Sequence, residues 1–247
     1  MARSEHVYGL HAVRALLERQ PARVRRLLLA RGRDDQRVAA LEGRARAAGI
    51  AVERAPPERL VQLAGEGVHQ GAVAEIEPLP PWHEEELLAA VAGARDPLVL
   101  ALDGVQDPHN LGACLRTADA CGVLALIVPK DRSAPLSATA RKVAAGAAET
   151  TPVVRVTNLV RTLKLLKDAG LWVVGADAAA EQPAAAVDLT GSRVLVMGAE
   201  GAGLRELTRR NCDWLVRLPS LGAVESLNVS VATGMLLYEA LRQRLSP

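Results

Sequence analysis

The segment from Asp103 to Asp119 places polar side chains where they can do chemistry. It reads Asp-Gly-Val-Gln-Asp-Pro-His-Asn-Leu-Gly-Ala-Cys-Leu-Arg-Thr-Ala-Asp, follows an apolar run and leads into an expected helix. Asn110 stands where the helix should begin, and Arg116 lies about one and two-thirds turns later, from where a long side chain leans back toward the loop. An amide and a guanidinium so placed can hold a phosphate or stabilise an oxyanion. The alternatives are a helix cap for Asn110 and a solvated or ion-paired Arg116.

A second candidate segment, Gly198-Ala-Glu-Gly-Ala-Gly203, follows an apolar run. Its glycines are in the order G-x-x-G-x-G, the reverse of the dinucleotide fingerprint, which argues against a nicotinamide-dependent dehydrogenase. Glycines at the end of a strand allow the backbone to approach a flat ligand closely. Glu200 within this loop either faces a bound substrate or is a solvated acid.

The third segment, Leu218 to Ala232, leads into an apolar helix that should end near Arg244. Ser226 is a plausible N-cap for this helix. Asn228 falls in the expected first turn, where asparagine has poor helix propensity and no evident capping role. A polar residue at this position indicates a functional site.

The elements that must position these segments form an α/β domain. Its strands are continuous apolar runs, which are typical of a parallel sheet buried on both faces. The ligand site of such a sheet lies beyond the carboxyl ends of the strands. The expected strands are Leu98–Leu102, Val123–Val128, Leu171–Val174 and Val194–Met197, and the expected helices are Leu111–Cys121, Ala138–Ala145 and Leu159–Ala169.

The first 77 residues predict a separate small α/β domain. Pro78-Leu-Pro-Pro81 marks its boundary, because this segment suits neither a helix nor a central strand. The division is therefore 1–77, a linker with an acidic helix at 78–97, and 98–247. The expected elements are a helix at Gly9–Arg19, a strand at Val24–Ala30, a helix at Asp35–Ala48, a strand at Ile50–Glu53, a helix after Pro56-Pro57, a strand at Gly71–Ile76 and the acidic helix at Glu84–Ala92.

Composition narrows the class of protein. With 49% hydrophobic and 23% charged residues, the chain is typical of a folded globular protein. No membrane-spanning run or signal peptide is recognisable, so a cytoplasmic location is expected. The three cysteines, Cys114, Cys121 and Cys212, lack metal-ligand spacing and are interpreted as buried small hydrophobes, and the five histidines are scattered. No metal site is predicted.

The net charge of +2 is unevenly distributed. Residues 1–33 contain eight Arg and two Glu, whereas residues 34–97 contain six Arg and twelve acids. A basic first segment suits phosphate contacts, and Arg23, Arg25, Arg26 and Arg31 are the candidate RNA-binding residues, with Arg19 and Arg33 beside them. The alternative is a merely solvated face, because 26 of the 30 basic residues are Arg, as in a GC-rich genome.

The three segments, in this order and context, resemble motifs 1, 2 and 3 of the SpoU/TrmH family of the SPOUT superfamily. Ser133 to Glu149 and the start Val7-Tyr-Gly-Leu-His-Ala-Val13 further resemble the bacterial branch that methylates the 2′-hydroxyl of a 23S rRNA guanosine. The resemblance implies a C-terminal SPOUT domain with a trefoil knot, an exception to the rule against threaded chains. It also implies an N-terminal L30e-like domain that binds RNA, and a guanosine in the peptidyl-transferase P loop as the target.

The resemblance further implies the cofactor, the assembly and the site. S-adenosyl-L-methionine (SAM) would bind, bent, in the knot of a homodimer, in which motif 1 of one subunit completes the site near the other. Glu225 departs from the small Ser of the rRNA branch and could alter substrate preference or simply face solvent. The implied catalytic residues are Asn110, Arg116, Glu200, Ser226 and Asn228, and the implied cofactor-binding residues are Met197, Gly198, Ala199, Gly203, Leu218 and Leu227.

A ribose hydroxyl is a poor nucleophile, so positioning and electrostatics should carry the catalysis. The family proposal makes Arg116 a base, but guanidinium groups hold their proton at neutral pH. We expect Arg116 to hold the substrate phosphate and stabilise the alkoxide, with a phosphate oxygen or water accepting the proton. The remaining alternatives are methylation of tRNA or of another rRNA site, and a non-catalytic RNA-binding assembly factor. The L30e-like front end disfavours the tRNA enzyme, and the intact polar residues disfavour the assembly factor.

Overall fold

The computed structural model describes residues 5–65, 68–77, 82–222 and 226–245. The chain forms two compact units that divide between Pro80 and Pro81, with Ala145–Thr150 counted in the first unit. The predicted proline boundary at residues 78–81 lies outside the described residues. The acidic helix, predicted to accompany a linker, belongs to the second unit.

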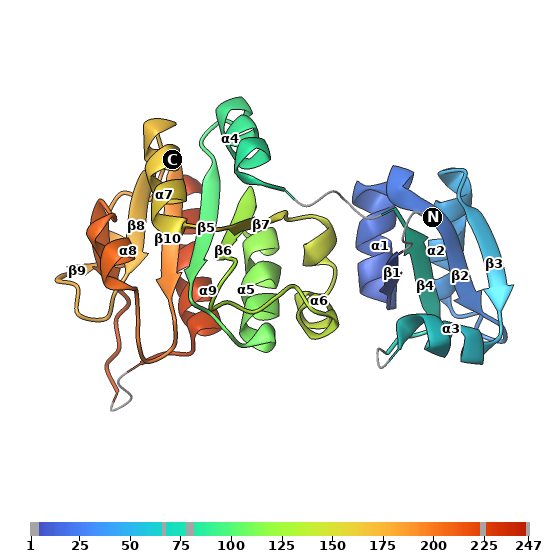
Figure 1. The fold of residues 1–247 in the computed structure, drawn as a ribbon. Helices are drawn as coiled ribbons and strands as arrows, with labels where there is room; N and C mark the ends of the chain where they lie inside the picture. Colours follow the sequence, from blue (N-terminus) through green and yellow to red (C-terminus); the bar gives the residue numbers. More distant parts are fainter. Residues whose placement is uncertain (1–4, 66–67, 78–81, 223–225, 246–247) are drawn as a thin grey trace. The chain divides into compact units, whose positions relative to one another are not determined.

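The first unit is built on a four-stranded sheet in the order β1-β4-β2-β3 (Figure 1). Strand β4 is antiparallel to β1 and β2, whereas β3 is parallel to β2. Buried leucines and valines of α1, α2 and the sheet form one core, and α3 contributes to a second, smaller cluster. The elements are β1 (Glu5–Tyr8), α1 (Leu10–Arg19), β2 (Val24–Ala30), α2 (Gln36–Ala47), β3 (Ala51–Ala55), α3 (Pro57–Ala64) and β4 (Ala72–Ile76).

The second unit contains a seven-stranded sheet in the order β7-β6-β5-β10-β8-β11-β9, and every strand pair in it is parallel. This confirms the predicted parallel sheet. Its strands are β5 (Leu98–Asp103), β6 (Ala125–Pro129), β7 (Val153–Val156), β8 (Trp172–Ala176), β9 (Gln182–Pro183), β10 (Arg193–Gly198) and β11 (Trp214–Arg217). Its helices are α4 (Glu84–Gly93), α5 (Pro108–Ala120), α6 (Ala138–Ala144), α7 (Leu159–Asp168), α8 (Glu206–Arg210) and α9 (Val229–Leu245).

Both faces of this sheet are covered, as the continuous apolar strands require. Helices α4 and α7 pack on one face, against a core that includes Val99 and Val196. Leu100 and Leu195, which point the other way, are also fully buried. Helix α9 contacts both β10 and α5. The central strands β5 and β10 therefore lie between two layers of helices. The second candidate segment begins where β10 ends (Figure 1).

Candidate active site

The loop after β10 is a tight turn that only glycine permits at its first position. Ala199 N donates to Gly203 O at 3.0 Å, and Gly203 N donates to Ala199 O at 2.9 Å. A Cβ on Gly198 would lie 2.1 Å from the carbonyl carbon of Gly203, far inside van der Waals contact. Gly201 and Gly203 have φ angles of 72° and 65°, in the left-handed region that favours glycine. The glycine spacing thus folds the chain back on itself and exposes Glu200.

A cavity opens beside this turn at the carboxyl ends of the parallel strands. All six residues expected to bind the cofactor line it, and so do Glu200 and Ser226. Its wall also includes residues that sequence reasoning missed. The expected cofactor residues are Met197, Gly198, Ala199, Gly203, Leu218 and Leu227, and the additional lining residues include Ala176, Asp177, Val216, Ser220 and Ala232.

Three of the predicted catalytic side chains form one hydrogen-bonded cluster. Asn228 Nδ2 donates to Glu200 Oε1 at 2.6 Å and to Asn110 Oδ1 at 3.0 Å. Asn110 Nδ2 in turn donates to Glu200 Oε1 at 3.2 Å. The backbone N of Val229 donates to the same oxygen, also at 3.2 Å. The structure therefore brings one residue of each motif together around a single carboxylate oxygen.

Two capping assignments from the sequence are wrong. Helix α9 begins at Val229, and Asn228 caps it, because its Oδ1 accepts from Ser230 N at 2.9 Å and from Val231 N at 3.4 Å. Ser226 is therefore not the N-cap, and Asn228 serves both the helix and the cluster. Likewise, α5 begins at Pro108 with Asp107 as its N-cap, so Asn110 lies inside the first turn and its amide is available to Glu200.

Arg116 lies apart from this cluster within one chain. Six residues separate it from Asn110, which rotates it by about 240° around the helix axis. Its side chain is exposed, and it does not line the cavity beside Gly198. Among the described residues it has neither a hydrogen bond nor an ion pair. The alternative of an ion-paired arginine therefore finds no support within the described chain.

A buried carboxylate fixes the far end of the glycine turn. Asp103, whose side chain is 0% exposed, ends β5 opposite Gly198 of β10. Its Oδ2 accepts from the backbone N of Arg205 at 3.0 Å. Its Oδ1 lies 3.0 Å from Arg205 Nε as an ion pair, although the angles do not meet those of a hydrogen bond. This pairing joins the start of motif 1 to Arg205, two residues beyond the end of motif 2, and no sequence spacing could reveal it.

Asp177, directly after β8, contributes a carboxylate to the cavity wall. Burial is the largest single effect and opposes its ionisation, but the hydrogen bonds from Arg209 Nε at 2.6 Å and Ala179 N at 2.8 Å, together with the charge of Arg209, outweigh it and lower the pKa of Asp177. The residue is therefore an ionised acceptor at neutral pH. The rule that ligands bind beyond the carboxyl ends of parallel strands could have identified it.

The cysteines and histidines form no metal site within the described ranges, where no group of three His, Cys, Asp or Glu residues is placed to hold an ion. Cys114 is buried, whereas Cys121 and Cys212 are only partly buried, which corrects the expectation that all three are buried. Among the described residues, no helix has the length and apolar character needed to cross a membrane.

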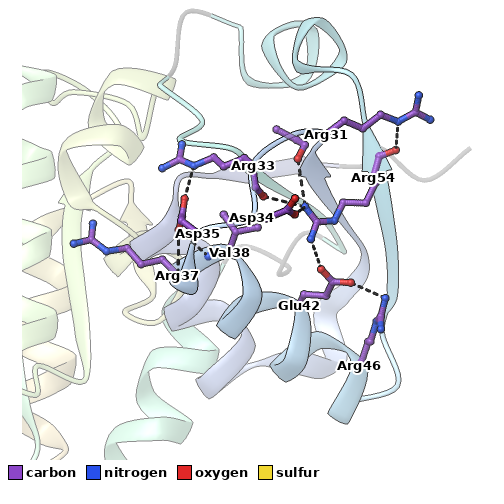
Figure 2. A network of polar contacts seen from close by, with 10 residues as sticks. Arg31, Arg33, Asp34, Asp35, Arg37, Val38, Glu42, Arg46 and Arg54 are labelled. Atoms are coloured by element: carbon purple, nitrogen blue, oxygen red, sulfur yellow. Dashed lines mark hydrogen bonds and ion pairs between the residues drawn. The ribbon is translucent and has the colours of Figure 1, made fainter.

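The arginines predicted to bind RNA have partners inside the first unit. Arg26 pairs with Glu75 at 2.7 Å and Glu53 at 2.8 Å, and Arg25 lies 3.8 Å from Glu77. Arg23 Nε donates to the backbone oxygen of Glu77, and Arg31 Nε donates to that of Arg54 (Figure 2). The charges along β2 are therefore largely balanced, and RNA binding by these residues stays a prediction.

Comparison with known proteins agrees with this site. The profile of the SpoU rRNA Methylase family matches residues 97–238, and a profile described as RNA 2'-O ribose methyltransferase substrate binding matches residues 6–82. The chain belongs to the SpoU rRNA methylase family.

Among its relatives, the 23S rRNA (guanosine-2'-O-)-methyltransferase RlmB of Pseudomonas aeruginosa is 58% identical, over 99% of this chain and 98% of the relative. The protein of the same name from Escherichia coli is 50% identical, over 98% and 99% of the two chains.

Solved structures extend the comparison to the fold. The SpoU methyltransferase AviRb of Streptomyces viridochromogenes, crystallised with AdoMet, superposes with a TM-score of 0.77 and 27% identity, over 99% of this chain and 92% of that chain. A TrmH/SpoU tRNA modifying enzyme from A. aeolicus, at 32% identity and a TM-score of 0.56, covers only 65% of this chain and 83% of its own. The rRNA relatives thus match both units, whereas this tRNA enzyme matches about two-thirds of the chain.

Proposed function

We propose that this chain transfers a methyl group from SAM to the ribose 2′-hydroxyl of a guanosine in 23S rRNA. The observation that carries the proposal is the cluster of Asn110, Glu200 and Asn228 beside the glycine-lined cavity. It joins all three motifs at the carboxyl edge of the parallel sheet, where ligands of such sheets bind. Relatives at 50–58% identity over nearly their whole length carry the name of this activity.

The cavity suits SAM. Its lining combines apolar side chains such as Val216 and Leu218 with the bare backbone of Gly203, where a Cβ would meet nothing within 4 Å, so a flat adenine can lie against the turn that Gly198 makes possible. Asp177 supplies an ionised acceptor for a hydroxyl or ammonium group. When bound, SAM supplies an electrophilic methyl group on a sulfonium. Met197, Ala199, Gly203 and Leu227 complete the proposed binding residues.

The polar cluster would orient the ribose. Glu200 Oε1 is engaged by Asn110, Asn228 and Val229, whereas Oε2 accepts no hydrogen bond from the described residues. This second oxygen is therefore available to a substrate hydroxyl. Ser226, on the cavity wall, is a further polar group for the substrate. Arg116 would hold the phosphate beside the target ribose and stabilise the developing alkoxide, while a phosphate oxygen or water takes the proton.

We propose a homodimer, because Arg116 does not reach its own cavity. Helix α9 carries an exposed apolar stripe of Val231, Met235 and Tyr238, whose side chains are 52%, 38% and 65% exposed. Their spacing of four and three residues places them on one helix face. We propose that a second copy covers this stripe and that Arg116 of one subunit completes the cavity of the other. The same proposal includes a trefoil knot in the second unit and an L30e-like fold for the first unit. It also includes a target guanosine in the peptidyl-transferase P loop of the rRNA and a cytoplasmic location.

Two measurements test the function. Isothermal titration calorimetry of SAM against the whole chain should show binding, and rRNA from a strain lacking the protein should lack one 2′-O-methylguanosine. SAM binding without any lost rRNA methylation would favour another substrate, such as tRNA. The absence of SAM binding would instead favour a non-catalytic assembly factor.

A further inference from the structure

A groove runs between α1 and α2 of the first unit, on a surface that the β2 arginines do not form. Leu10 and Leu41 are buried at its base. Ala40 leaves the middle of the groove open, because a methyl group stands there between longer side chains. The groove is lined by Leu10, His11, Arg14, Gln36, Arg37, Ala40, Leu41 and Arg44.

The rim of this groove has more positive than negative charge. Arg14 and Arg44 share one carboxylate, that of Glu18, which Arg14 Nε contacts at 2.9 Å. The hydrogen bond from Arg14 lowers the pKa of Glu18, so this acid is ionised at neutral pH and neutralises only one of the two arginines. Arg37 makes no side-chain hydrogen bond or ion pair with any described residue.

The neighbouring polar network explains why Arg37 is left unpaired. The carboxylate nearest to it in sequence, Asp35, caps α2 through Arg37 N and Val38 N and pairs with Arg33 at 2.8 Å (Figure 2). Glu42 is engaged by Arg46 and Arg54, at 2.6 Å and 2.5 Å. In Figure 2 the Arg37 guanidinium points away from this network and carries no dashed line. Glu42, the one acid within α2, and the N-cap residue Asp35 are therefore already paired with other arginines.

The spacing of these cations suits a phosphate backbone. Arg37 and Arg44 lie seven residues apart on α2, which is two helical turns, so both face the groove, about 10 Å apart along the axis. Arg14 faces them from α1. A surface that binds RNA through its backbone needs exposed guanidinium groups that outnumber its acids, because each guanidinium that neutralises a phosphate releases the counterions held there. The groove has three arginines against the single acid Glu18. Strand β2 lacks such an excess, because Arg25 and Arg26 lie against three acids, Glu53, Glu75 and Glu77.

We infer that the α1–α2 groove, lined by Arg14, Arg37 and Arg44, is the surface through which the first unit holds the sugar-phosphate backbone of its RNA. This inference rests on the proposed function for the identity of the RNA. It differs from the sequence-based expectation, which placed the contacts on Arg23, Arg25, Arg26 and Arg31 of the β2 region.

The test compares two double variants of the full-length protein that each remove two exposed charges from the first unit. Arg14→Gln/Arg37→Gln changes the groove, whereas Arg25→Gln/Arg59→Gln changes β2 and α3. The probe is a fluorescein-labelled 23S rRNA hairpin that the wild-type protein methylates, and binding is measured by anisotropy from about 50 to 200 mM salt. The groove variant should bind roughly tenfold more weakly, and the slope of log K against log salt should fall by about two. The control variant should change neither quantity appreciably.

A second variant distinguishes a loss of RNA contacts from misfolding of the protein. Ala40→Glu leaves every arginine in place but adds a carboxylate three residues after Arg37 and four before Arg44, where it can pair with both. It should also weaken RNA binding, with an unchanged melting temperature. Equal effects of the groove and control variants, or wild-type affinity in Ala40→Glu, would overturn the inference. SAM affinity, measured by calorimetry, should be the same in all variants. If the wild-type chain itself fails to bind SAM or to methylate rRNA, the proposed function fails independently of the groove.

Discussion

The side-chain amide of Asn228 lies 2.6 Å from Glu200 Oε1, and its carbonyl oxygen caps the helix that begins at the next residue. One side chain thus fixes the start of α9 and orients the carboxylate of motif 2. These duties can be separated, because a hydroxyl can cap a helix but cannot donate two bonds to Glu200 and Asn110.

Asn228→Ser should retain most of the stability and lose activity. Serine is as good an N-cap as asparagine, whereas Asn228→Ala should cost about 1 kcal/mol. Both variants should lose up to about 10²-fold in kcat, because Glu200 Oε1 loses the shortest of its three hydrogen bonds and is held less firmly. Urea unfolding and methyl-transfer assays of the two variants check this. Full activity in Asn228→Ser would show that only the cap matters.

Arg116→Lys should lower kcat by about 10²- to 10³-fold, because an ammonium keeps the charge but loses the planar fork that fits a phosphate. The affinity for SAM should be unchanged, since the role proposed for Arg116 is to hold the RNA phosphate and to stabilise the alkoxide, not to bind the cofactor. The matched control is Arg161→Lys on α7, an exposed arginine 3.8 Å from Glu84. Near-wild-type turnover in Arg116→Lys would count against the proposed role.

Gly198→Ala should abolish SAM binding, because the added methyl would lie 2.1 Å from the backbone of Gly203 and force the turn apart. Calorimetry of the variant checks this. Gly43→Ala is the control, since a Cβ there meets nothing within 4 Å and Gly43 lies inside α2. An unaltered Kd for SAM in Gly198→Ala would mean that the turn does not shape the cofactor site.

The thiols of Cys114 and Cys212 should resist alkylation in the native protein. Burial raises the pKa of Cys114 to about 11 and that of Cys212 to about 12. At pH 7.5 fewer than about one in a thousand of either would be thiolate, which is the reactive form. Iodoacetamide labelling followed by mass spectrometry should modify Cys121 first. Equal labelling of Cys114 in native and urea-unfolded protein would contradict this.

Stability of the first unit should depend on the ionisation of Glu75. The hydrogen bond from Arg26 lowers the pKa of Glu75 below its ordinary value of 4.5, so its stabilising effect is present above that value and is lost as pH falls through the lower folded-state pKa. Glu75→Gln should therefore lower Tm at pH 7, and the difference from wild type should shrink as the solution is acidified. A difference that stays constant down to pH 3 would rule out this linkage.

Much of the scaffold could be predicted from hydrophobic patterning. Strand β2 matches its predicted bounds, and β5 and β10 are each extended by a residue or two, because their apolar runs are continuous. Strands β7 and β11 were missed, since Val153–Val156 and Trp214–Arg217 each contain an arginine and are only four residues long. Such short, partly polar segments give no periodic signal.

The residues that form the site could be predicted from the sequence, but the hydrogen bonds and ion pairs among them could not. The six cofactor residues implied by the resemblance to the family line one cavity. The capping of α9 by Asn228 was missed because Ser226 is an equally good cap by residue type. The Asp103–Arg205 pair joins residues 102 apart and arises only from the register of β5 beside β10. Long-range pairing of this kind is invisible to local patterns.

Mass spectrometry of the reaction product shows directly whether this chain methylates a ribose hydroxyl of rRNA. The purified chain is incubated with SAM and an unmodified 23S rRNA transcript, and the RNA is digested to nucleosides. We expect one new nucleoside, 2′-O-methylguanosine, whose formation depends on Arg116 and Glu200. A guanosine methylated on its base, or no methylated nucleoside at all, would contradict it.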